Sequence, residues 1–311
     1  MKFTASKFPI YLLVSASLTT FNLPALQGES HCPGSIASVT PRLVAGALVV
    51  IPVTVNGRGP FDFMVDTGSQ VTVVDPSLAQ ELGLKPQGTV GLVSTASYAQ
   101  ASGSVLDSLK AGGQAVGHSL AVVRDLGQIQ AADPHIRGVL GEDFLAHFDM
   151  LIDYGRKILC LDATGSMRDK VRGERISLVS PQHPEDELAF AQRLVVAVHL
   201  SSAGSRQILL QLDSGSDGPI LYQTRGQSRL SILDHATLRS DTASAAQRAF
   251  AALPPQDLRI GGRTLSQVPF VTPVSVGSDV PNRDEDGLLP TVLFQRVFIS
   301  FAGRYITINP R

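Results

Sequence analysis

The chain has 311 residues, a length that suits two domains of about 150 residues or one unit with two lobes. Hydrophobic residues make up 43% of it, and 28 glycines and 19 prolines indicate a globular, turn-rich protein and exclude a disordered one. Its 26 basic and 27 acidic residues nearly cancel, which argues against a nucleic-acid or an anionic-membrane partner.

The N-terminus carries the pattern of a secretory signal. Lys2 and Lys7 precede an apolar run over residues 8–18, which is shorter than the about 20 residues that a membrane span needs. We therefore expect residues 1–28 to be a signal peptide, with a cleavage site that the sequence does not define. The mature protein is then exported to the periplasm or the extracellular space and keeps no stable membrane span.

Cys32 and Cys160 are the only two cysteines of the sequence. In an oxidising compartment they can form a disulfide, and otherwise they are two unpaired or buried thiols; the sequence leaves both alternatives open. The sequence has no CxxC motif, and its 7 histidines show no spacing typical of metal ligands. We therefore expect no metal site and no cofactor.

A hairpin leads to the first motif of interest. Asn56-Gly57 is a favoured two-residue hairpin turn, and the strand that returns from it, over residues 61–65, ends at Asp66. Three small residues follow the acid, namely Thr67, Gly68 and Ser69. A carboxylate between apolar strands is costly to desolvate unless hydrogen-bond donors surround it, and small residues of this kind supply such donors.

A short helix and further strands follow. Asp75 as the N-cap and Gly83 at the C-terminus predict a helix between them. The glycine pair that begins at Gly112 predicts a second hairpin turn, and apolar strings predict strands over residues 150–154 and 157–161.

The first motif recurs in the second half of the chain. An apolar run ends at Asp213, 147 residues after Asp66, and the acid is followed by Ser214, Gly215 and Ser216. Three further landmarks repeat at almost the same spacing: Gly112 with Gly261, Gly138 with Gly287, and Ile152 with Ile299. Four landmarks in one order predict two copies of one β-rich unit of about 120 to 130 residues.

Two Asp-Thr/Ser-Gly-Ser motifs, each preceded by apolar residues, resemble the paired catalytic motifs of the aspartic proteases of the pepsin and retropepsin type. The resemblance covers residues 49–310. It implies an all-β, bilobal, pepsin-like acid protease fold made of two retropepsin-like β-barrel lobes. We expect an N-terminal lobe over residues 35–165, a connector over residues 166–190 and a C-terminal lobe over residues 191–311.

By this resemblance, Asp66 and Asp213 are the catalytic acids and face each other across a pseudo-two-fold axis between the lobes. Two carboxyl groups in contact do not both ionise readily, so they share one proton and titrate as a unit. The ionised partner draws a proton from a water molecule, and the protonated partner polarises the carbonyl of the peptide bond.

The family pattern also implies roles for six supporting residues, which are Thr67, Gly68, Ser69, Ser214, Gly215 and Ser216. The hydroxyl residue directly after each acid is expected to hydrogen-bond across to the other turn and to fix the spacing of the two turns. Each glycine lets backbone amides approach a carboxylate closely. The serine that ends each motif is expected to donate its hydroxyl to the outer oxygen of its acid, which favours the charged form.

The second copy departs from the family pattern at two positions. Pro290 stands where the first copy has Gly141, so the packing behind the two acids is expected to differ. Asp217 follows the second motif where an apolar residue is typical, and it either shifts the titration of the dyad or faces solvent. Residues 282–287 mimic the start of a calcium loop without its final glutamate, and we expect them to be an exposed acidic loop.

The residue that covers the substrate is less sharply defined. Pepsin-like enzymes lay a first-lobe hairpin with a tyrosine over the substrate, and Tyr98 is the only tyrosine in that region of this chain. Tyr98 is therefore the candidate substrate-binding residue, with an ordinary strand aromatic as the alternative. In the second copy the repeat predicts a strand over residues 242–253, whereas the alanine-rich composition predicts a helix, and both remain open.

The sequence thus predicts an aspartic endopeptidase that acts on a peptide or protein substrate as a monomer with pseudo-two-fold symmetry. Two alternatives remain. In the first, the diverged second copy leaves a catalytically inactive protein that binds peptides without cleaving them. In the second, two chains pair their first lobes, as single-lobe retropepsins do, and only Asp66 is used.

Overall fold

The computed structural model describes residues 32–34, 36–94, 98–179, 193–222, 230–238, 249–277 and 284–310. These residues belong to one compact unit, His31–Arg311. The predicted signal peptide and residues 180–190 of the predicted connector lie outside the described part. Among the described residues, no helix has the length and apolar character needed to cross a membrane.

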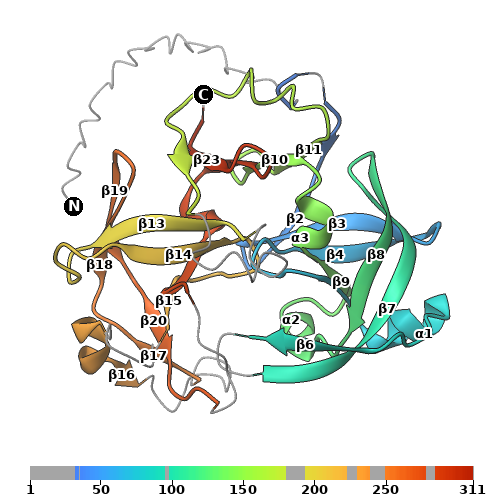
Figure 1. Cartoon of the computed structure of the whole chain (residues 1–311), viewed down its shortest axis with the longest axis horizontal. Helices are drawn as coiled ribbons and strands as arrows, with labels where there is room; N and C mark the ends of the chain where they lie inside the picture. Colours follow the sequence, from blue (N-terminus) through green and yellow to red (C-terminus); the bar gives the residue numbers. More distant parts are fainter. Residues whose placement is uncertain are drawn as a thin grey trace, which may run out of the picture. The chain divides into compact units, whose positions relative to one another are not determined.

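Three β-sheets with a few short helices make up this unit, so the predicted all-β fold class is confirmed (Figure 1). In the part of the chain that the structure describes, the helices are α1 (Pro76–Leu82), α2 (Gly127–Gln130) and α3 (Glu142–Leu145), and the 3-10 helices are η2 (Ser231–His235) and η3 (Thr291–Leu293). The first helix begins and ends as predicted. The Asp75 side chain accepts a hydrogen bond from the Leu78 N–H, and Gly83 closes the helix with a left-handed φ of 68°.

The first sheet has eight strands, in the order β2-β3-β4-β9-β5-β8-β7-β6. The strands are β2 (Arg42–Val44), β3 (Leu48–Val55), β4 (Arg58–Val65), β5 (Thr72–Val74), β6 (Thr89–Val93), β7 (Tyr98–Ala111), β8 (Gln114–Val123) and β9 (Ile136–Leu140). Asn56 and Gly57 join β3 to β4, and both have the positive φ that this two-residue turn requires. Gly112 and Gly113 turn β7 into β8 in the same way, so both predicted hairpins are present.

The second sheet has nine strands, in the order β16-β17-β20-β15-β21-β14-β13-β18-β19. The strands are β13 (Val195–Leu200), β14 (Ile208–Asp213), β15 (Ile220–Leu221), β16 (Thr237–Leu238), β17 (Phe250–Ala252), β18 (Gln256–Ile260), β19 (Arg263–Val268), β20 (Val271–Pro273) and β21 (Gly287–Pro290). The choice between strand and helix is decided for β17, which is a strand. Residues 239–248, where the alanine-rich run begins, lie outside the described part.

The two sheets have the same topology around their central strands. In the first sheet β4 runs parallel to β9, β9 is antiparallel to β5, and β5 runs parallel to β8. In the second sheet β14 runs parallel to β21, β21 is antiparallel to β15, and β15 runs parallel to β20. The internal repeat predicted from the sequence is therefore present in the fold.

The third sheet contains strands from both copies. Its order is β1-β11-β10-β22-β23-β12, and its strands are β1 (Ser38–Val39), β10 (Asp149–Asp153), β11 (Ile158–Asp162), β12 (Ile176–Ser177), β22 (Arg296–Ser300) and β23 (Tyr305–Ile308). The central strands β10 and β22 are antiparallel, with Leu151 opposite Phe298. These two residues are 147 positions apart, the same spacing as Asp66 and Asp213. A pseudo-two-fold axis therefore passes between β10 and β22.

One cluster of buried apolar side chains runs through all three sheets. Phe63 in β4, Leu210 in β14 and Ile152 in β10 are each at most 1% exposed. Burying a side chain of this size stabilises the fold by about 1.5 to 3 kcal/mol. The strands that lead to Asp66 and Asp213 are thus anchored on the same core.

Cys32 and Cys160 form a disulfide, which decides between the alternatives that the sequence left open. The bond joins the segment before β1 to β11, and both half-cystines are buried. The two residues are 128 positions apart. In the chain-entropy model, closing a loop of that length raises the free energy of the unfolded chain and so stabilises the fold by about 4 to 5 kcal/mol.

Candidate active site

Asp66 and Asp213 lie at the ends of equivalent strands, and their side chains meet. Asp66 directly follows β4, and its N–H donates to the Leu140 carbonyl of β9 at 3.0 Å. Asp213 is the last residue of β14 and lies in register opposite Pro290 of β21. The two carboxyl groups are hydrogen-bonded to each other. The duplicated fold thus brings together two acids from distant parts of the chain.

The glycine of each turn packs against the acid of the other turn. A Cβ atom on Gly68 would lie 2.7 Å from the carboxyl carbon of Asp213, and a Cβ atom on Gly215 would lie 2.5 Å from the carboxyl carbon of Asp66. No side-chain carbon fits at such distances in a close-packed interior. The two glycines therefore set how closely the carboxyl groups approach each other.

Thr67 and Ser214 make four hydrogen bonds between the two turns. The Thr67 hydroxyl donates to the Leu212 carbonyl at 2.9 Å and accepts from the Ser214 N–H at 3.0 Å. The Ser214 hydroxyl donates to the Val65 carbonyl at 2.8 Å and accepts from the Thr67 N–H at 3.1 Å. Both side chains are buried, so this reciprocal set holds the turns in one relative position, which is the geometry expected of these two residues.

The expected hydrogen bonds from the hydroxyls of Ser69 and Ser216 to the acids are not made, so this prediction is wrong. The Ser69 hydroxyl donates to the Val71 carbonyl, and the Ser216 hydroxyl donates to the Gly218 carbonyl, both at 2.8 Å. A hydroxyl has one hydrogen, so neither serine can also donate to a carboxylate. In a tight turn the serine hydroxyl already lies close to the carbonyl two residues further on, so it donates to that carbonyl and not to the carboxylate.

Backbone N–H groups supply the donors to the acids instead. The N–H groups of Gly68 and Ser69 donate to Oδ1 of Asp66 at 2.8 and 3.1 Å. The Gly215 N–H donates to Oδ1 of Asp213 at 2.7 Å. The backbone N–H groups of each tight turn therefore donate to the carboxyl group of the same turn.

The pKa values of the two acids are raised unequally. Burial raises the pKa of Asp66, and hydrogen bonds from Asp213 and from the N–H groups of Gly68 and Ser69 partly offset this rise. Asp213 is 7% exposed, and its pKa is raised well above its usual range by burial and by the charge and hydrogen bond of Asp66. The pair therefore shares one proton and carries one negative charge.

Val139, Leu140 and Gly141 pack beside the first turn. A Cβ atom on Gly141 would lie 2.5 Å from the backbone carbonyl carbon of Val71, so the chain passes too closely for any other residue. The Gly141 N–H donates to the Thr72 hydroxyl at 3.3 Å. The string thus fixes the outgoing side of the first turn.

The second copy replaces this hydrogen bond by two prolines. Leu212 pairs with Leu289 as Val65 pairs with Leu140, which makes Pro290 the counterpart of Gly141. Pro219 is the counterpart of Thr72, because it lies 147 residues further along. The donor and the acceptor are lost together, and such a paired loss is nearly neutral because no buried polar group is left without a partner. The departure at Pro290 is therefore compensated within the second copy.

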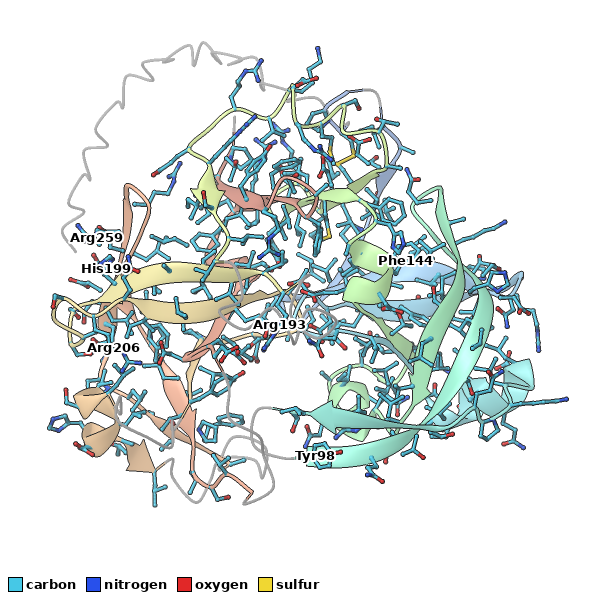
Figure 2. All side chains as sticks on the ribbon, in the orientation of Figure 1. Tyr98, Phe144, Arg193, His199, Arg206 and Arg259 are labelled. Atoms are coloured by element: carbon cyan, nitrogen blue, oxygen red, sulfur yellow. A yellow bond between two sulfur atoms is a disulfide. The ribbon has the colours of Figure 1, made fainter. Side chains whose placement is uncertain are left out.

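Asp217 and Tyr98 both have exposed side chains. Asp217 faces solvent. Tyr98 is the first residue of β7, opposite Val93 of β6, at the tip of the β6–β7 hairpin, and its exposed fraction is 37% (Figure 2). Its neighbours on this face of the hairpin, Val93 and Gln100, are also exposed, whereas the residues of the other face are half-buried. The tyrosine thus lies on the more exposed face of a first-copy hairpin.

The prediction of an exposed acidic loop over residues 282–287 is wrong for two of its acids. Glu285 is 1% exposed and pairs with Arg193 at 2.6 Å. Asp286 is 7% exposed, pairs with Arg206 at 2.5 Å and also accepts from the Leu209 N–H. The arginine partners come from 80 or more residues earlier in the chain, so the local sequence gives no sign of them.

Glu142 is a third acid near the dyad. Its side chain is 1% exposed, and its N–H donates to the Ser69 carbonyl at 2.8 Å. Burial raises its pKa well above its usual range, and Arg193 partly opposes the rise. Its Oε1 has no hydrogen-bond partner among the described residues. A charged residue directly after the apolar string that ends at Gly141 was the available signal for a buried acid at this place.

No cluster suited to a metal ion occurs in the described ranges, which hold no group of three or more His, Cys, Asp or Glu side chains so placed. The donors that surround the two acids are backbone N–H groups of their own turns. Two paired acids with backbone donors around them form an arrangement that is suited to proton transfer.

Comparison with known proteins gives a family for the first copy. Residues 51–144 match the family model described as aspartyl protease, and this segment contains Asp66 but ends before the second copy. A crystal structure of a retropepsin-like aspartic protease from Rickettsia conorii matches 40% of this chain and 87% of its own chain, at 26% sequence identity and a TM-score of 0.30. No curated protein matches the chain. The resemblance to aspartic proteases is thus confirmed for this segment.

Proposed function

We propose, starting from the membership of residues 51–144 in the aspartyl protease family, that this chain is an aspartic endopeptidase. A water molecule held between Asp66 and Asp213 attacks the carbonyl of a peptide bond. The observation that carries the proposal is the hydrogen bond between these two acids, one from each copy, with each glycine of the turns packed on the opposite carboxyl group.

The inequality of the two acids supports a division of labour between them. Asp66 carries the charge, so it takes a proton from the water as the general base. Asp213 carries the proton, so it protonates the carbonyl oxygen on which negative charge develops. As the tetrahedral intermediate breaks down, the proton on Asp66 passes to the departing amine, and Asp213 recovers a proton from the hydroxyl group that becomes the new carboxyl group.

The position of Tyr98 supports a role for the β6–β7 hairpin as a cover over bound peptide. The side chain lies at the hairpin tip, opposite Val93, and is exposed. A tyrosine there combines apolar area with a hydroxyl group that can bond to a peptide backbone. We assign it to substrate binding on this basis.

Two observations favour this proposal over the alternatives. Asp213 meets Asp66 within one chain, so a second chain is not needed to complete the dyad. The proline pair of the second copy leaves no unpaired backbone donor, so its divergence does not imply an inactive site. The proposed active form is therefore a monomer.

The disulfide supports the proposed export of the protein. Disulfides such as that between Cys32 and Cys160 persist in oxidising compartments, and the periplasm and the extracellular space are both of this kind. This agrees with the signal-like pattern over residues 1–28. Peptide or protein substrates outside the cytoplasm complete the proposal.

Hydrolysis of a denatured protein across a range of pH tests the function. We expect a bell-shaped dependence of kcat/KM on pH with an acidic optimum, and inhibition by a statine-type transition-state analogue. Activity appears as Asp66 ionises, and it is lost as the pH rises through the pKa of Asp213, because the dyad then has no proton to give. The raised pKa of Asp213 extends activity above the ordinary titration range of an aspartate. Activity that stays constant into the alkaline range would contradict the dyad chemistry.

Gly215→Ala tests the close approach of the acids. The added methyl group must displace the Asp66 carboxyl group by about 1 Å, and a misplacement of this size costs roughly 100-fold in rate. We expect kcat to fall by about that factor. Gly218→Ala is the matched control, since no atom lies within 4 Å of a Cβ at that position. Equal rates in the two variants would show that the spacing of the acids does not matter.

A further inference from the structure

The residues that stand two positions before the acids differ between the copies. Met64 precedes Asp66 and Gln211 precedes Asp213, and both side chains are 2% exposed. Burying a glutamine costs free energy unless its amide group finds partners, and burying a methionine does not. A buried amide in one copy alone points to a task that only one of the two acids requires.

The amide group of Gln211 has partners on both sides. Its Oε1 accepts from Nη2 of Arg193 at 2.8 Å, and its Nε2 donates to the Gly68 carbonyl at 3.3 Å. This orientation follows from chemistry, because a guanidinium group only donates and a carbonyl only accepts. Arg193, which Figure 2 labels near the ends of β13 and β14, also pairs with the buried Glu285. A line of hydrogen bonds thus runs from a cation of the second copy into the first turn.

The Gly68 carbonyl belongs to the same peptide unit as the Ser69 N–H. This N–H donates to Oδ1 of Asp66 at 3.1 Å, and the Gly68 N–H donates to the same oxygen at 2.8 Å. A hydrogen bond to a peptide carbonyl polarises the unit and strengthens its N–H as a donor. The line of hydrogen bonds that begins at Arg193 therefore ends on the carboxylate of Asp66 and favours its charged form.

The related position of the first copy cannot support the second turn in this way. The counterpart of Gln211 is Met64, and a thioether has no hydrogen to donate to the Gly215 carbonyl. The Gly215 N–H bonds to Asp213 as the Gly68 N–H bonds to Asp66. The second turn therefore lacks the side-chain donor that reaches the peptide unit of the first turn.

We propose that Arg193 and Gln211 are positioning residues that hold the negative charge of the dyad on Asp66 and leave the shared proton on Asp213. They act through the backbone of the first turn and touch neither substrate nor reacting atoms. The inference rests on the proposed function, because it assigns the base and the acid of that reaction.

Four titratable groups near the dyad leave this assignment in place, and a fifth, Asp143, bonds to the Thr72 hydroxyl behind the first turn, where burial raises its pKa to about 6. Glu142 is neutral in the acidic range, since burial raises its pKa well above its usual range. Tyr154 lies near the second acid, and burial raises its pKa to about 12, so it is also neutral. Glu285 is ion-paired with Arg193. Arg304 donates to backbone carbonyls at 2.9 and 3.3 Å.

Gln211→Met gives the second copy the residue of the first and tests the proposal through the pH dependence of kcat/KM. The charged form of Asp66 loses support, so the first ionisation of the dyad moves to higher pH. We expect the acidic limb of the pH profile to move to higher pH by about half a unit. The shift is small because the bond from Gln211 only strengthens the charge-assisted hydrogen bond between the Ser69 N–H and Asp66. The alkaline limb stays in place, because Asp66 is ionised on both sides of it and loses the same support in both states.

A second variant and a control separate this effect from a loss of stability. Gln211→Glu keeps an acceptor for Arg193 but, when ionised, offers no N–H to the first turn, so the acidic limb again moves to higher pH. Gln256→Met also replaces a buried glutamine of the second copy, and it removes hydrogen bonds to Ser201 and to two proline carbonyls. We expect this control to lower stability and to leave both limbs unchanged.

The outcomes distinguish this inference from the proposed function. Active Gln211→Met and Gln211→Glu proteins with the wild-type acidic limb would overturn the inference and leave the function standing. A wild-type protein without hydrolysis at any pH overturns the function instead. Carbon-13 NMR titration of the Asp66 and Asp213 carboxyl groups then decides the inference by itself. We expect Asp66 to ionise first, at a pH that rises in Gln211→Met, and an unchanged titration would refute this.

Discussion

Asp213→Asn is expected to lower kcat for peptide hydrolysis by about 1,000-fold, the effect of losing a positioned general acid. Asparagine has nearly the shape of aspartic acid, so it can keep the packing of Gly68 against residue 213. It has no proton to give to the carbonyl oxygen of the substrate. The measurement is kcat at the acidic optimum, with circular dichroism to show that the variant is folded.

Asp217→Asn is the matched control for this result. It makes the same aspartate-to-asparagine substitution four residues after Asp213, at a side chain that faces solvent. We expect its kcat to stay within about twofold of the wild type, since exposed substitutions away from the site have small effects. A protein that keeps full activity in Asp213→Asn uses a different acid, and the homodimer with Asp66 alone then becomes the better explanation.

Thr67→Val is expected to lower the free energy of unfolding by about 2 to 4 kcal/mol. Valine has the shape of threonine, but it leaves the Leu212 carbonyl and the Ser214 N–H without their partner from the other turn. Each buried polar group left in this way costs about 1 to 3 kcal/mol, and the turns also lose half of their reciprocal set. Urea denaturation measures the change as a lower midpoint at an unchanged slope.

Thr89→Val separates this effect from the general consequence of the substitution. Thr89 is an exposed residue of β6, where valine fits a strand as well as threonine does. We expect a change within about 0.5 kcal/mol. A Thr67→Val protein as stable as Thr89→Val would mean that the bonds between the turns add nothing to the fold.

Much of the fold and the core of the site could be predicted because the relevant signals are local. Asn56-Gly57 and the pair at Gly112 specify turns by their backbone preferences, and the structure has both hairpins. The repeat of the acids at a spacing of 147 predicts the shared topology and, with it, the meeting of Asp66 and Asp213. A duplicated pattern carries long-range information that a single motif lacks.

The predictions that fail involve a competition that the sequence does not reveal. Ser69 and Ser216 have both a carboxylate and a backbone carbonyl within reach, and the local carbonyl wins in both turns. The acids at Glu285 and Asp286 read as an exposed loop because their arginine partners are distant in sequence. Once paired, a carboxylate can be buried at a cost that the pairing offsets.

The line from Arg193 through Gln211 to Gly68 could not be predicted at all. Gln211 is an unremarked polar residue in an apolar strand, and its task depends on a carbonyl 143 residues earlier in the chain. The contrast with Met64 becomes informative only after the pairing of β14 with β21 has fixed which positions correspond.

The axis between Leu151 and Phe298 relates two halves that are covalently one molecule, and such halves are free to differ. Where two identical subunits meet, each side chain at the axis occurs twice, and the two protonation microstates of the paired acids are degenerate. A fused chain removes this degeneracy, here by an amide opposite a thioether. The two directions in which a peptide chain can lie in the site therefore differ already in the free protein.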